Sequence, residues 1–213
     1  MNLRSFHRTS AIAIAVFAVF HIANHLMSLL SIPAHMAAMK AFRAVYRQGA
    51  VEVILLLCVA FQVASGLWFV MRDWKQKQGL IPWLQAISGL YLVFFLLVHV
   101  SAVMFARSVL NLDTNFYFAA AGFYAPPYQF FFAPYYFLAV LALFTHLGCA
   151  AYWQCLARPR TARILALALP IGIGGTMSLL IVLSLAGLIR PIEIPAKYKS
   201  TYASPNPEIR SKP

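Results

Sequence analysis

Four histidines lie inside long apolar stretches of this sequence, and they are the side chains most able to do chemistry there: His21, His25, His99 and His146. An ionisable residue at membrane depth is costly to bury, so its presence is by default a functional hypothesis. A single buried histidine is explained equally well as a neutral ring that bonds a carbonyl of a neighbouring helix. Four such histidines in one small protein favour a cofactor site. His7 and His35 lie near segment ends, where exposure to solvent is expected.

Two of these histidines match in depth. His25 lies 16 residues after Thr9 and His99 lies 16 residues after Trp83, the points at which their apolar segments begin. At 1.5 Å per residue, both rings are ~24 Å from the start of their helices. The first and third segments cross the membrane in the same direction, so the two imidazoles can face each other. Because helix bundles build cofactor sites from facing side chains, the pair predicts the two axial ligands of one haem iron.

His146 belongs to a second level, nearer the other side of the membrane. The residue at the matching depth of the parallel segment is Gln62, which is not a usual haem ligand. Three interpretations stay open for this level. Gln62 packs without a cofactor, or His21, one helical turn from His25, completes a second haem site with His146. Alternatively, Gln62 and His146 bond a quinone head group.

The elements that must position these residues are transmembrane helices. Of the 213 residues, 62% are hydrophobic and only 10% are charged, whereas a soluble domain has about a quarter charged. A helix needs about 20 apolar residues to cross the hydrocarbon core. The predicted fold is an all-α bundle of five transmembrane helices within residues 1–190, and the segments are 9–32, 50–71, 83–106, 130–156 and 162–189.

The connections differ in kind. Residues 35–48 place apolar and basic side chains on different faces at helical spacing, which predicts a short amphipathic helix lying in the membrane interface. Residues 111–134 are rich in Phe and Tyr, as is typical of an interfacial aromatic belt. The polar, Pro-rich tail of residues 191–213 is predicted to be an extended extramembrane arm.

The net charge of +12, from 17 Lys and Arg against 5 acids, does not indicate nucleic-acid binding. The cations lie at the ends of apolar segments, where membrane lipids and the positive-inside rule favour them. The short basic loops predict an integral protein of the inner (cytoplasmic) membrane with a cytoplasmic N-terminus. The cations assigned to that inner side are Arg4, Arg8, Arg72, Lys75, Lys77, Arg158, Arg160 and Arg163.

Several motifs resemble one family. Residues 84–103, LQAISGLYLVFFLLVHVSAV, are similar to a segment of the form LQ-x-x-[ST]-G followed by an apolar run and a ligand histidine, here His99. FTHLGCAAYW places His146 at a second ligand position, and AFQVASGLWFV has Gly66 four residues after a third, occupied here by Gln62. The chain resembles the membrane cytochrome b subunit of succinate dehydrogenases and fumarate reductases in its single-chain, five-helix form, and diverges from it at Gln62.

The resemblance implies haem b, a quinone, and electron transfer with flavoprotein and iron–sulfur subunits or another redox membrane complex. The chain would then be a membrane anchor and electron-transfer subunit, not a self-sufficient enzyme. His-Arg-Thr-Ser, from His7, is similar to an HR-x-S opening near a quinone site, which indicates Arg8 and Ser10. Glu52 can take protons from a quinol, or it is an ordinary acid at a helix N-terminus.

The sequence leaves a second function open and disfavours a third. The loss of a ligand at Gln62 leaves open a non-redox structural or assembly subunit that binds lipid or a pigment such as (bacterio)chlorophyll. A transporter is disfavoured, because the sequence has no inverted repeat and Glu52 is the one acid near a membrane segment that could take part.

Overall fold

The computed structural model describes residues 2–202, and over that range the chain is helical, with no strand. Five helices are long and apolar enough to cross a membrane: α1 (Leu3–Met27), α3 (Gly49–Arg72), α4 (Leu80–Ser108), α6 (Gln129–Gln154) and α7 (Arg160–Leu185). The predicted all-α membrane bundle is therefore confirmed. The shorter helices are α2 (Ile32–Tyr46), α5 (Phe116–Ala121) and α8 (Ala196–Lys199), with single 3₁₀ turns η1 (Trp74–Gln76), η2 (Gly122–Tyr124) and η3 (Ser200–Tyr202).

The first helix begins and ends earlier than the predicted segment 9–32. The Asn2 side chain accepts a hydrogen bond from the Ser5 backbone N–H, which caps the helix N-terminus. At the other end, Ser31 is extended and its hydroxyl accepts from the Ala34 N–H at 3.1 Å, so it caps a new helix. Pro33 lies in the first turn of that helix, where its missing N–H costs nothing. Residues 28–31 are therefore a corner between α1 and α2.

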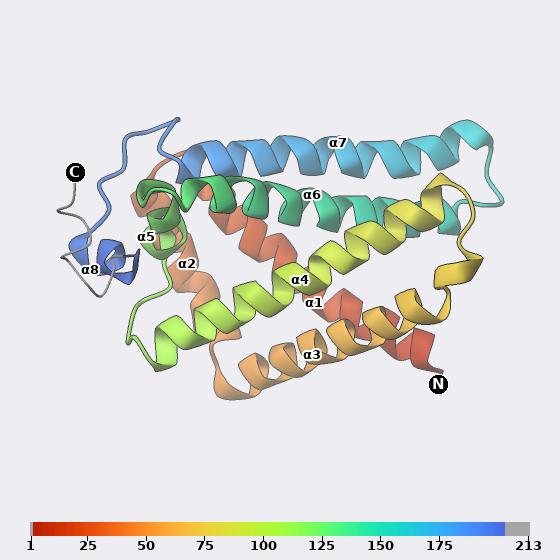
Figure 1. The fold of residues 1–213 in the computed structure, drawn as a ribbon, viewed down its shortest axis with the longest axis horizontal. Coiled ribbons are helices and arrows are strands. Elements are labelled where there is room, and N and C mark those ends of the chain that lie inside the picture. Colours follow the sequence, from red (N-terminus) through yellow and green to blue (C-terminus); the bar gives the residue numbers. More distant parts are fainter. Residues whose placement is uncertain (1, 203–213) are drawn as a thin grey trace, which may run out of the picture.

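The bundle has two distinct ends (Figure 1). The N-terminus, the α3–α4 connection and the α6–α7 turn gather at one end, which we call the basic end. Short helices α2, α5 and α8 gather at the other, which we call the capped end. Helices α6 and α7 lie side by side along their length, α4 packs against α3 and α6, and α1 packs against α2 and α3. The basic end carries the cations that the sequence assigned to the inner side of the membrane.

The segment after α7 folds back on the capped end. Ile194 and Tyr198 are 2% and 1% exposed, and they pack with Phe116 and Leu185. The Tyr198 hydroxyl donates to the backbone carbonyl of Asp113 at 3.0 Å. The predicted extended arm is therefore wrong for residues 191–202, because their apolar side chains complete a core. The rest of that predicted arm, residues 203–213, lies outside the described residues.

Replacing Tyr198 by alanine tests how much this capping segment stabilises the fold. Truncating a buried aromatic residue leaves a cavity, so Tyr198→Ala is expected to lower the free energy of unfolding by about 3 kcal/mol. Tyr198→Phe removes the hydroxyl alone and is expected to cost about 1 kcal/mol. The measurement is denaturant unfolding in detergent micelles. The exposed neighbour Lys199, changed to alanine, is the control, and equal stability of Y198A and K199A would contradict the prediction.

Candidate functional site

Four imidazoles form a line near the capped end of the bundle. The ring centres of His99 on α4 and His21 on α1 are 6.0 Å apart, and those of His21 and His25 are 4.9 Å apart. His35 on α2 continues the line, with its ring centre 5.4 Å from that of His25. Three helices that are separate in sequence thus bring their histidines to one level. We call these residues the outer histidine cluster.

His21 and His99 are held by stacking. Each ring lies on the phenylalanine one turn earlier in its own helix: Phe17 with His21 at 5.4 Å and 19°, and Phe95 with His99 at 4.9 Å and 14°. Within residues 2–202, the ring nitrogens of His21, His25 and His99 make no hydrogen bond to protein, and Nδ1 of His25 is a buried atom without a partner. A buried polar atom is normally bonded, so this level has spare ligating capacity.

The helices that carry His21 and His99 are spaced apart. Over the described residues, α1 and α4 do not pack closely against each other, although both pack against α3. Their side chains meet between the two helices, and His21, His25 and His99 are each partly exposed. The cluster therefore joins α1 to α4 through side chains, at a level where the two helices do not pack closely.

His35 is the cluster member that the sequence did not identify. Its expected exposure is wrong, because it is 2% exposed and its Nδ1 donates to the Asn24 carbonyl at 2.7 Å. Burial, together with nearby Arg43, lowers the pKa of His35, while the bond to Asn24 raises it. A sequence signal existed: His35 and the buried Met39 are one turn apart on the apolar face of α2.

The pairing of the histidines in the structure differs from the pairing that their matching depths predicted. On α1, His21 is the ring paired with His99, while His25 pairs with His21 and His35. The one-turn offset arises because α1 begins at Leu3, so counting from Thr9 does not give the true depth. His21 therefore lies in the outer cluster and not beside His146.

His146 and Gln62 lie nearer the basic end, in separate polar contacts. Nδ1 of His146 donates to the Gln85 carbonyl on α4 at 3.1 Å. The Gln62 amide donates to the His7 carbonyl and, at 2.7 Å, to the Ser10 hydroxyl on α1. Gln62 is thus a bridge between α3 and α1, and no bond joins it to His146.

The residues predicted for quinone or proton transfer are at opposite ends of the bundle. Ser10 contacts Gln62 and Arg8 is exposed, both toward the basic end. Glu52 lies in the first turn of α3 and pairs with Arg107, with one bond of 3.2 Å between Nη2 and Oε2. Because ten residues of α3 span about 15 Å, Glu52 and the Ser10–Gln62 contact do not share one pocket.

The outer histidine cluster does not have the ligand set that a bare metal ion needs. Among the described residues, no group of three or more His, Cys, Asp or Glu is arranged to hold a metal ion. A protein-bound zinc takes at least three protein ligands, whereas haem iron takes four porphyrin nitrogens and at most two axial side chains. Metal–imidazole bonds are about 2 Å long, so two axial imidazoles have ring centres about 6 Å apart. The ring centres of His21 and His99 lie 6.0 Å apart, in a T-shaped contact with an interplanar angle of 69°.

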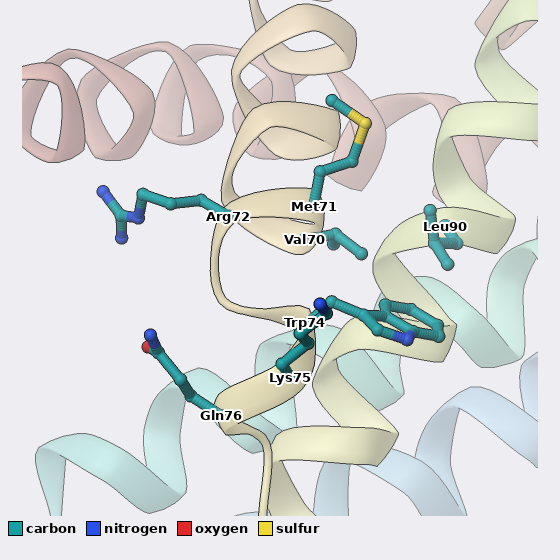
Figure 2. Close-up of a pocket in the computed structure, with 7 residues that line it drawn as sticks. All are labelled: Val70, Met71, Arg72, Trp74, Lys75, Gln76 and Leu90. Carbon is teal, nitrogen blue, oxygen red and sulfur yellow. The ribbon is translucent and has the colours of Figure 1, made fainter.

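A surface cavity of about 520 Å³ lies elsewhere, where α3 meets η1 at the basic end. Figure 2 shows Val70, Trp74 and Leu90 on its α4 side, while Arg72 and Gln76 extend the other way. Its lining combines apolar and cationic side chains, as suits the boundary between hydrocarbon and lipid headgroups. No histidine, cysteine or acidic side chain lines this cavity, which is separate from the outer histidine cluster.

No family model, no curated protein and no solved structure matches this chain. The likeness to cytochrome b subunits rests on the short sequence motifs alone.

Proposed function

We propose that the chain is a haem b-binding membrane anchor that passes electrons between a quinone and a partner redox protein. The observation that carries the proposal is the pair of imidazoles, His21 and His99, which face each other at 6.0 Å without hydrogen-bond partners in the described protein. Packing alone gives no reason to hold unbonded polar rings inside an apolar bundle. Two axial ligands for one iron give such a reason.

Three histidines of the outer cluster and two neighbouring phenylalanines have distinct parts in this proposal. His99 on α4 and His21 on α1 would hold the haem iron, with His25 as the alternative that the depth match favoured. Phe17 and Phe95 orient the two imidazole rings by stacking, so no ring nitrogen of His21 or His99 is needed for a hydrogen bond that holds the ring in place. A haem iron held in this way gains and loses single electrons, which is the chemistry that the subunit would contribute.

Partners at the basic end complete the proposal. Exposed cations there, among them Arg4, Arg72 and Lys75, suit an acidic surface on a flavoprotein or iron–sulfur subunit. The same cations favour a cytoplasmic N-terminus in the inner membrane, beside anionic lipids. Arg8, Ser10 and Glu52 stay predictions for quinone and proton transfer, since Ser10 and Glu52 already have protein partners.

Haem content of the purified chain tests the proposal. The full chain, expressed with haem biosynthesis supported and purified in mild detergent, is expected to show the spectrum of a low-spin b-type haem. A short-chain quinol is then expected to reduce that haem. A preparation without a Soret band contradicts the proposal, and (bacterio)chlorophyll in the native complex would favour the non-redox alternative.

A further inference from the structure

The surface cavity at the basic end lies where a membrane helix reaches the membrane surface. Its volume is about 520 Å³, and it lies between the last turn of α3, the turn η1 and α4. Leu90, which lines its α4 side, comes ten residues after the start of α4 at Leu80, or about 15 Å along the helix axis. The cavity therefore extends from the membrane interface toward the hydrocarbon core.

The two halves of this cavity differ in polarity. Met71 and Leu90 line the apolar half, and the Met71 side chain is 66% exposed. The Trp74 indole extends over this half toward Leu90 (Figure 2), and it is exposed as well. Lys75 and Gln76, on η1, contribute the polar half. A cavity that is apolar toward the bilayer core and cationic at its surface has the polarity of a binding site for an amphiphile.

The Trp74 ring is held in place from two sides. Its centre lies 5.0 Å from that of Trp83, in an edge contact at 88°, and Nζ of Lys77 lies 5.5 Å from it. Lys77 also donates to the Val70 carbonyl at 3.1 Å, in the last turn of α3. This wall of the cavity is thus formed in advance, which lowers the entropic cost of binding a ligand against it.

Lys75 is the cation of this cavity that is left for a ligand. The Arg72 guanidinium already donates to the Asp73 carboxylate at 2.6 and 2.8 Å, and Lys77 has the contacts described above. In the described part of the chain, Lys75 makes no hydrogen bond or ion pair with the protein, and no acid lines the cavity. Residues 72–77 contain three cations and one acid, so they carry a net charge of +2. The charge favours an anionic ligand.

An anionic phospholipid matches both halves of the cavity. Its phosphodiester accepts hydrogen bonds, which the Lys75 ammonium and the Gln76 amide can donate. Its acyl chains are apolar, and a tryptophan at headgroup level is typical of membrane proteins. We propose that this cavity binds one anionic phospholipid, with the phosphate against Lys75 and Gln76 and an acyl chain against Trp74 and Leu90.

Other anions would use the polar half alone. A free phosphate leaves Met71 and Leu90 uncovered, and so does an acidic surface of a partner protein, although Lys75 is among the cations that suit such a partner. The lipid is favoured because the apolar half extends toward the hydrocarbon core, where its acyl chain lies. A lipid site of this kind does not require haem, so it stands or falls separately from the proposed electron transfer.

Native mass spectrometry of the full chain tests the site. Protein released from micelles with equal amounts of phosphatidylglycerol and phosphatidylcholine is expected to retain one phosphatidylglycerol. Lys75→Gln is expected to lower the affinity about tenfold, because a hydrogen bond to a charged group is worth at least that much. Lys75→Arg keeps the charge and is expected to retain the lipid. Arg158→Gln removes an exposed cation of the same end that does not line the cavity, and it is expected to bind as wild type does.

Competition separates the lipid from the other anions. Dihexanoyl phosphatidylglycerol is expected to displace the retained lipid, whereas glycerol 3-phosphate and hexaglutamate, which lack acyl chains, are expected to leave it bound. Displacement by glycerol 3-phosphate at the same concentration overturns the lipid in favour of a phosphate site, and displacement by hexaglutamate assigns Lys75 to protein docking. Equal retention of the two phospholipids, or equal losses in Lys75→Gln and Arg158→Gln, also overturns the proposal.

Discussion

His99→Ala is expected to abolish the low-spin haem signal of the outer cluster. His99 is the α4 member of the cluster, and its ring faces His21 at 6.0 Å. Under the proposed function, His99 would hold the haem iron, so its removal would convert a low-spin centre into a high-spin or empty one. The optical and electron paramagnetic resonance spectra of the purified variant measure the change, which we expect to be a loss of at least tenfold in low-spin signal.

The same spectra identify the ligand from α1. If His21 is the axial ligand, His21→Ala resembles His99→Ala, while His25→Ala keeps a low-spin centre with a shifted spectrum. The opposite pattern assigns His25, as the depth match predicted. Phe94→Ala is the control on α4, because Phe94 is exposed and is the neighbour of the stacking residue Phe95. A low-spin signal of full strength in His99→Ala contradicts the proposed site.

The sequence was sufficient to predict the five helices, because apolar length is a strong and local signal. It was also sufficient to select the residues of the outer cluster on α1 and α4. It could not predict the partner of each ring, because a shift of a few residues in a helix start moves the predicted depth by a full turn. Asn2 makes that shift: its capping bond starts α1 at Leu3, and His21 then meets His99.

Features that depend on tertiary contacts could not be predicted from the sequence. The His7 ring is held by a 2.7 Å hydrogen bond between its Nδ1 and the hydroxyl of Ser65, 58 residues away in the chain. The burial of Tyr198 depends on Phe116 and Leu185 meeting at the capped end. Periodicity describes one helix at a time, so it cannot assign such contacts. His35 is the intermediate case, since its helical face was predictable but its bond to Asn24 was not.

Helices α6 and α7 pack against each other more extensively than any other pair of elements in the described residues, and a glycine makes this close packing possible. An added Cβ at Gly174 on α7 would overlap Cβ of Phe144 on α6 and lie 2.7 Å from its Cγ. Cβ cannot move without moving the α6 backbone, so Gly174→Ala forces the helices apart. We expect a loss of about 3 kcal/mol in the free energy of unfolding, at the upper end for overpacking.

Gly172→Ala is the matched control for this prediction. It lies on the same helix, and an added Cβ there meets nothing within 4 Å. With no clash, alanine is favoured over glycine inside a helix by about 1 kcal/mol, so G172A is expected to be as stable as wild type or more so. Denaturant titration of both variants in one detergent measures the difference, and equal stabilities would contradict the packing argument. Because α4 packs against α6, G174A is also expected to lose haem at a lower temperature than G172A, although neither residue belongs to a histidine site.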